Sequence, residues 1–173
     1  MKKMKSNTKR ICLAALFTAL IFVFTAWLHI PSHTGYTHVG DGFLFLAACL
    51  LPWQYGVGCG VAGAFLADCL TGYAMWAPGS IIIKGVTALF FTAKGEKILS
   101  WRNLLGLIPS GALCIGGYYC YEGLITGNFT APLAGIPGYV TQWVLSSALY
   151  LVAGFTLDKL KIKKTLRKEG LLE

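Results

Sequence analysis

Long apolar runs recur along this chain, and they constrain its fold more than any other feature. The first, residues 11–30, is apolar over about 20 positions, which is enough helix to cross a hydrocarbon core of ~30 Å. Only 13% of all residues are charged, about half the share in soluble domains. We therefore expect an all-α integral membrane protein of about six transmembrane helices. The six segments are 11–30, 39–51, 55–70, 77–93, 104–125 and 136–157.

Two of these segments need a further decision. The first follows several Lys and Arg residues, as a secretory signal would, but the sequence from Trp27 to Pro31 offers no small-residue cleavage site. We interpret it as a retained helix, followed by a polar loop at 31–37. The second, 39–51, is too short for an upright span, which predicts a half-helix or a strongly tilted one.

The basic residues indicate an orientation. All of the 15 Lys and Arg except Lys84 lie before residue 11, at 94–102 or after residue 158, and six spans place these three regions on one side. That side should be cytoplasmic, in contact with lipid head groups. The expected parts are a basic cytoplasmic N-terminus (1–10), a transmembrane domain (11–158) and a charged cytoplasmic tail (159–173) that ends as a frayed surface helix. The clustering argues against a nucleic-acid partner despite the net charge of +8.

Sequence motifs for catalysis or nucleotide binding are missing. The chain contains no GxxxxGK[ST] loop, no HExxH and no GxSxG, so any ATPase must be another chain, and we assign no catalytic residue, cofactor or metal. The six cysteines lie in or beside apolar segments without a CxxC pair, which favours small packed thiols over zinc or disulfides. A membrane-embedded enzyme and a stand-alone secondary transporter or channel remain as alternatives.

Four ionisable residues fall inside apolar segments, where an unpaired charge is costly and marks function. They are Asp41, Asp68, Lys84 and Glu122. The expected topology places all four toward the outer side, where they could converge on one outward-facing cavity. The alternative is a structural salt bridge, such as Lys84 with Asp68.

Aromatic residues gather on the same outer side, where they would stack on a flat heteroaromatic ligand or form an interfacial belt. They are Trp27, Tyr36, Tyr73, Trp76, Tyr118, Tyr119 and Tyr121. Three histidines, His29, His33 and His38, lie close together nearby. We interpret them as loop residues that contact solvent or ligand, in preference to a metal site.

Small residues line one side of two segments. In the first, Ala15 and Ala19 are four apart and share a helix face, with Ala14 and Thr18 beside them. Such a face lets another helix approach closely, either a partner's or one within this chain. The third segment has a similar ladder at Gly56, Gly60, Gly63, Ala64 and Ala67, for which internal packing is the favoured interpretation.

Several of these residues form an ordered set of short motifs. They are HVGDG at 38–42, AD at 67–68, GY at 72–73, WAP at 76–78 and IKG at 83–85. In this order and spacing, over about residues 10–158, the chain resembles the substrate-capture (S) components of energy-coupling factor (ECF) importers. It is most similar to the riboflavin and hydroxymethylpyrimidine type.

The resemblance implies a compact six-helix bundle in the bacterial plasma membrane that binds a small vitamin or precursor near its outer face. The compound would be of the riboflavin, hydroxymethylpyrimidine (thiamine precursor) or pyridoxine class, which the shared motifs do not distinguish. The implied partners are a transmembrane coupling subunit, which docks on Ala15 and Ala19, and two cytoplasmic ATPases. The expected substrate-binding residues are Tyr36, His38, Asp41, Asp68, Tyr73, Trp76, Lys84 and Glu122.

Overall fold

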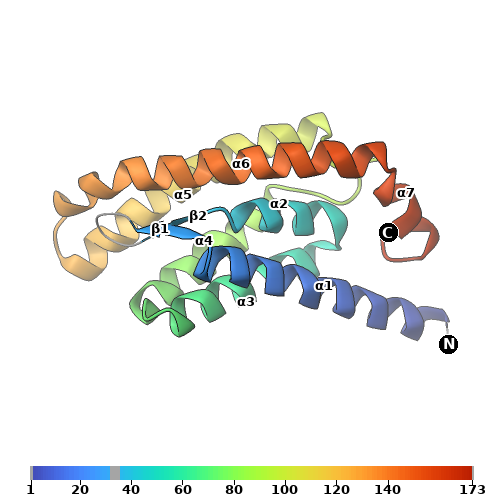
Figure 1. The fold of residues 1–173 in the computed structure, drawn as a ribbon, viewed down its shortest axis with the longest axis horizontal. Helices are drawn as coiled ribbons and strands as arrows, with labels where there is room; N and C mark the ends of the chain where they lie inside the picture. The colour runs from blue at the N-terminus through green and yellow to red at the C-terminus, as the bar shows by residue number, and fades with distance from the viewer. Residues whose placement is uncertain (1, 32–35, 173) are drawn as a thin grey trace.

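The computed structural model describes residues 2–31 and 36–172, and these are mostly helical (Figure 1). Three stretches are long and apolar enough to cross a bilayer, Asn7–Ala26, Trp101–Thr126 and Ala131–Lys159. Each of the six predicted segments overlaps one of helices α1 to α6, which confirms the all-α membrane fold, although the first helix ends at Ala26 and residues 29–30 of that predicted segment lie in a strand. The elements are α1 (Lys2–Ala26), β1 (His29–Pro31), β2 (Tyr36–His38), α2 (Asp41–Leu50), α3 (Trp53–Leu70), the 3-10 turn η1 (Ala74–Trp76), α4 (Ala77–Leu89), α5 (Trp101–Thr126), the 3-10 turn η2 (Ala131–Gly135), α6 (Ile136–Lys159) and α7 (Ile162–Lys168).

Helix α2 is the centre of the bundle. It has 10 residues, nine of them buried, so it is about half as long as a full span, as predicted for the short second segment. In Figure 1 it lies between α6 on one side and α1 and α3 on the other. Glycines permit this close packing: a Cβ on Gly42 would lie 2.8 Å from the carbonyl oxygen of Ser146 on α6.

Helix α1 packs along α3, and the contact divides its ladder of small residues into two faces. The Cys59 thiol donates to the carbonyl oxygen of Ala14 at 3.3 Å, and a Cβ on Gly63 would lie 3.2 Å from the carbonyl oxygen of Thr18. Ala15 and Ala19 are exposed instead. The face that carries these two alanines is therefore free for a neighbour outside the chain.

Within the stretch 31–37, expected to be a polar loop, the described residues Pro31, Tyr36 and Thr37 belong to a two-stranded hairpin. Strands β1 and β2 pair antiparallel, with His29 opposite His38 and Pro31 opposite Tyr36. Strands of three residues are too short for an alternation pattern to reveal them. The end of the bundle that carries this hairpin is called the hairpin end below.

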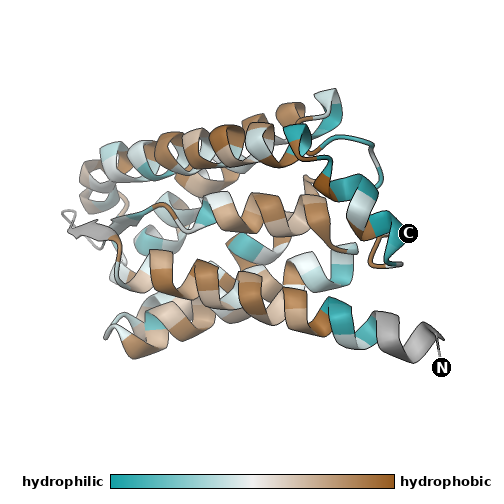
Figure 2. Cartoon of the chain, turned by 45° about the vertical axis from the view of Figure 1, so that its right-hand side comes forward, coloured by the Kyte–Doolittle hydropathy of each residue, from teal (hydrophilic) through white to brown (hydrophobic). Residues whose placement is uncertain are grey.

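The opposite end carries both termini and is called the basic end (Figures 1 and 2). The sequence predicts that the tail ends as a frayed surface helix, but in the structure the tail packs against the rest of the chain. Lys163 of α7 is buried, donates to the carbonyl oxygens of Gly95 (2.9 Å) and Lys97 (3.3 Å), and has a lowered pKa because of burial. Ion pairs Arg167–Glu96 and Lys9–Glu169 join α7 and the residues after it to the 94–102 loop and to α1.

The orientation in the membrane remains a prediction with a direct test. Ala131 lies at the exposed hairpin end and Lys97 in the exposed loop of the basic end. In a background with Cys12, Cys69 and Cys120 changed to alanine, because these native thiols are exposed, we expect Ala131→Cys to react with an impermeant maleimide added to intact cells. Lys97→Cys should react only after permeabilisation, and the reverse pattern would overturn the cytoplasmic assignment of the basic end.

Candidate functional site

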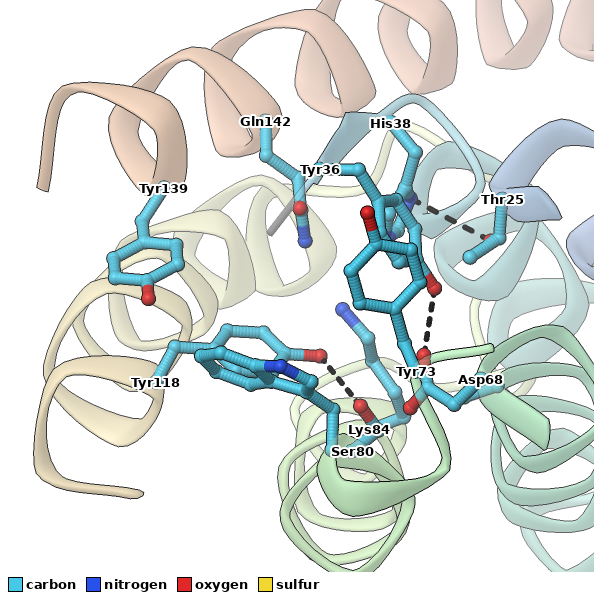
Figure 3. Close-up of a pocket in the computed structure, with 12 residues that line it drawn as sticks. Thr25, Tyr36, His38, Asp68, Tyr73, Ser80, Lys84, Tyr118, Tyr139 and Gln142 are labelled. Carbon is cyan, nitrogen blue, oxygen red and sulfur yellow. Dashed lines mark hydrogen bonds between the residues drawn. The ribbon is translucent and has the colours of Figure 1, made fainter. Parts of the chain in front are cut away.

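A small cavity of about 40 Å³ lies inside the hairpin end, and side chains from five helices and β2 meet around it (Figure 3). The volume is enough for one or two water molecules. Twelve residues line it: Thr25, Tyr36, His38, Ala64, Asp68, Tyr73, Trp76, Ser80, Lys84, Tyr118, Tyr139 and Gln142.

A buried ion pair forms the floor of the cavity. Lys84 Nζ donates to Asp41 Oδ2 at 2.7 Å, and both side chains are less than a tenth exposed. Gln142 Nε2 donates to the same oxygen at 3.0 Å, and the ammonium lies 5.0 Å from the centre of the Tyr118 ring. Asp41 occupies the first turn of α2, where the helix dipole favours a carboxylate. The charges of this site are therefore held at fixed positions.

The ion pair corrects one alternative drawn from the sequence. Within the described residues, Lys84 pairs with Asp41 and not with Asp68. The first turn of α2 reaches the Lys84 side chain because α2 packs against α4 in the middle of the bundle. Residue order favours a bridge between consecutive segments, here α3 and α4, and does not reveal this contact.

Asp68 faces the cavity with one of its two carboxylate oxygens making no hydrogen bond within the described residues. Its Oδ1 accepts from the Tyr36 hydroxyl at 2.6 Å, which joins the hairpin to α3. Its Oδ2 is buried and makes no hydrogen bond within the described residues, although Ser80 is a close polar neighbour. A buried carboxylate oxygen without a donor is unfavourable, so this atom is suited to receive a donor from a ligand.

Aromatic rings form the walls. Tyr36 and Tyr73 lie 4.8 Å apart between ring centres, and Tyr118 stacks on Tyr139 at 5.5 Å with an interplanar angle of 24°. Trp76 lies 6.1 Å from Tyr118. This arrangement suits a flat aromatic molecule, which would gain stacking on several rings as well as burial.

The structure gathers most of the predicted binding residues around the cavity. Tyr36, His38, Asp68, Tyr73, Trp76 and Lys84 line it. Asp41 and Glu122 do not line the cavity, but each binds a residue that does. Asp41 accepts from Lys84, and Glu122 Oε2 accepts from the Tyr139 hydroxyl at 2.6 Å. The two carboxylates therefore act on the cavity through its lining residues.

The sequence pattern marked none of Thr25, Ser80, Tyr139 and Gln142, and it assigned Ala64 to internal packing, although all five line the cavity. Tyr139 and Gln142 are three apart and so share one face of α6. A glutamine in a membrane segment, on the same face as a tyrosine, was the available signal, because amides within a bilayer need hydrogen-bond partners.

Trp27, Tyr119 and Tyr121 lie outside the cavity lining, whereas His38 lines it. Trp27 is 78% exposed, and the Tyr119 and Tyr121 hydroxyls donate to backbone carbonyls of Phe129 and Met75. His38 Nδ1 accepts from the Gly40 amide at 3.2 Å. The His29 side chain and His33 lie outside the described residues, and the part of the chain that is described contains no cluster of three metal-ligating residues.

Comparison with known protein families shows which family the chain matches. The family model described as ECF-type riboflavin transporter, S component, matches residues 5–159, which include every residue that lines the cavity. No curated protein matches the chain.

Proposed function

Because the chain belongs to the family of ECF-type riboflavin transporter S components, we propose that it captures riboflavin in the hairpin-end cavity for uptake. The family identifies the chain as the substrate-binding subunit of a vitamin transporter and not as an enzyme. The buried Oδ2 of Asp68, which makes no hydrogen bond within the described residues and lies beside stacked rings, is the observation that supports a ligand site here.

The chemistry of riboflavin matches this cavity. Its isoalloxazine is a flat, fused ring system, which suits the walls made by Tyr73, Trp76 and Tyr118. One edge of the ring system carries an imide N–H between two carbonyl groups. The N–H can donate to Asp68 Oδ2, and a carbonyl can accept from the Lys84 ammonium, which has donors beyond the one used by Asp41. Both contacts would be made away from water, where they are stronger.

The size of the cavity implies movement on binding. Ligand sites for drug-sized molecules have volumes of roughly 300–1,000 Å³, far more than the 40 Å³ present here. Three of the lining rings, Tyr36, Tyr73 and Trp76, lie on the hairpin and on the short α3–α4 connection at the end of the bundle. We infer that these rings move apart to admit the vitamin and then close over it.

Delivery would require partners. The sequence has no phosphate-binding loop for ATP, so two ATPases and a transmembrane coupling subunit would supply the energy and the release step. The exposed face at Ala15 and Ala19 would contact the coupling subunit, and the hairpin end would face outside the cell, in the bacterial plasma membrane. These assignments agree with the distribution of Lys and Arg.

Substitutions in the cavity should weaken binding of riboflavin. We expect Asp68→Ala, Tyr73→Ala and Trp76→Ala each to raise Kd by at least about tenfold, or roughly 1.4 kcal/mol, through loss of an acceptor or of a stacking surface. Tyr119→Ala is the matched control, because that ring lies outside the cavity lining and should leave Kd unchanged. Isothermal titration calorimetry on folded protein measures Kd for each variant. Unchanged affinity in all three cavity variants would place the site elsewhere.

The proposed function has a test that does not presume the ligand. Cells are grown with vitamins, and the chain is purified from them in a detergent mild enough to keep the fold. The small molecules released on denaturation are then identified by mass spectrometry. We expect riboflavin at close to one molecule per chain and its depletion in Trp76→Ala. Recovery of a different compound at that ratio would refute riboflavin as the substrate.

A further inference from the structure

A second cleft, of about 240 Å³, lies at the basic end, remote from the vitamin cavity. It is bounded by the turn between α2 and α3, the end of α4 and the first turn of α5. Its inner wall is apolar and includes Ala48, Leu89 and Phe91, and its rim carries the cations of Lys94 and Arg102. The residues that line it include Lys94 and Arg102 and no Asp or Glu, so the net charge of the cleft lining is positive and favours an anion.

The cations are held on a rigid frame. The Asn103 side chain accepts from the Thr92 amide at 2.9 Å and donates to the carbonyl oxygens of Thr92 and Ile98, each at 3.0 Å. Asp158 accepts from the amides of Ile98 and Leu99. The 92–99 loop is therefore tied to α5 and α6, which fixes the backbone that carries Lys94 at the rim of the cleft.

Arg102 is similarly fixed. It lies in the first turn of α5, and its Nη1 donates to the carbonyl oxygen of Phe90 at 3.2 Å, which keeps the guanidinium at the rim of the cleft. The side chain is still exposed, and a guanidinium has five N–H donors in a planar fork that suits phosphate oxygens. A phospholipid has an anionic phosphate next to apolar acyl chains. The cleft has cations at its rim next to an apolar wall, so the two are complementary.

The position of the cleft in the membrane agrees with this chemistry. Trp53 lines it and is 63% exposed, and Trp101, beside Arg102, is 75% exposed. Exposed tryptophans at the end of membrane helices mark the interface between acyl chains and head groups. Leu89 is also half exposed, so the apolar wall continues onto the lipid-facing surface of α4.

From this arrangement we propose that the cleft binds one anionic phospholipid, with its phosphate between Lys94 and Arg102 and the upper part of an acyl chain against Leu89 and Ala48. Basic pockets of this kind between membrane helices recognise acidic head groups. A free phosphate would gain only the rim contacts and nothing from the apolar wall. The proposal is independent of the vitamin that the other cavity takes.

The full-length protein is mixed in detergent with phosphatidylglycerol or phosphatidylcholine whose acyl chains have equal length. Native mass spectrometry then measures how much of each lipid stays bound when the detergent is removed. We expect wild type to retain phosphatidylglycerol, with at least about fivefold stronger binding than phosphatidylcholine. The double variant Lys94→Gln/Arg102→Gln should lose that preference. The matched control Lys164→Gln/Lys168→Gln removes the same charge from exposed positions on α7 and should retain it.

Three results would overturn the proposal. They are equal binding of the two lipids by wild type, the same loss in both double variants, and binding of glycerol 3-phosphate that matches phosphatidylglycerol, which would leave no role for the apolar wall. Riboflavin titration of the same samples is run in parallel. It should show an unchanged Kd in Lys94→Gln/Arg102→Gln, so failure of lipid binding and failure of vitamin binding are separable.

Discussion

Replacing Ala15 or Ala19 with tryptophan is expected to abolish vitamin uptake while leaving vitamin binding by the isolated chain unchanged. Both alanines are exposed on α1, whereas their neighbours Ala14 and Thr18 face α3. A large side chain on the exposed face meets nothing within the chain, but it prevents another helix from approaching closely. The expected loss of uptake is at least about a hundredfold, measured with labelled riboflavin in cells that express all subunits.

The control for this experiment is Ala112→Trp, because Ala112 is an exposed alanine on α5, away from α1. It should leave uptake and complex formation at wild-type levels. Copurification with the coupling subunit separates the possible causes: the α1 variants should bind vitamin but not the partner. Normal uptake in both α1 variants, or loss of vitamin binding in them, would show that this face is not the docking surface.

The second large effect concerns the buried pair of Lys84 and Asp41. Lys84→Met removes one charge and leaves the Asp41 carboxylate buried with only the Gln142 amide as its described hydrogen-bond donor. Breaking a buried pair in this way costs about 3–5 kcal/mol. The double variant Asp41→Asn/Lys84→Met contains neither charge, so we expect it to recover most of that stability.

A double-mutant cycle compares wild type, Asp41→Asn, Lys84→Met and the double variant. The free energy of unfolding of each is measured by denaturation from mixed micelles. We expect a coupling energy of at least about 2 kcal/mol, since residues in direct contact are not additive. Additive losses would show that the two charges are stabilised separately, each by other polar groups. Vitamin binding should weaken in the double variant even when it is stable, because Lys84 lines the cavity.

The helices follow from the sequence because apolar length is a strong signal in a membrane. The predicted segments differ from the helices mainly at their ends, as at α4, which stops at Leu89 and not at Ala93. The reason is Asn103, which binds the backbone of Thr92 and Ile98 and holds the intervening chain as a loop. Such a contact joins residues whose proximity no local pattern reveals.

The candidate site was predictable only for residues that are costly in a bilayer. Asp68 and Lys84 drew attention by charge and Tyr36, Tyr73, Trp76 and Tyr118 by their rings, and these six line the cavity, whereas Trp27, Tyr119 and Tyr121 do not. The partner of Lys84 depended on which helices touch, and Ser80 and Gln142 carry no charge to mark them. Ser80 on α4 contacts Tyr118 on α5, and Gln142 on α6 contacts Asp41 on α2, so these hydrogen bonds depend on how the helices pack.

Selective binding of riboflavin in the hairpin-end cavity can be measured directly by a fluorescence titration. Riboflavin is itself fluorescent, and stacking against Trp76 and the tyrosines should quench it. We expect saturable quenching with one site per chain that a hundredfold excess of thiamine, hydroxymethylpyrimidine or pyridoxine does not reverse. Absence of saturable quenching, or its full reversal by one of those competitors, would contradict selective binding of riboflavin.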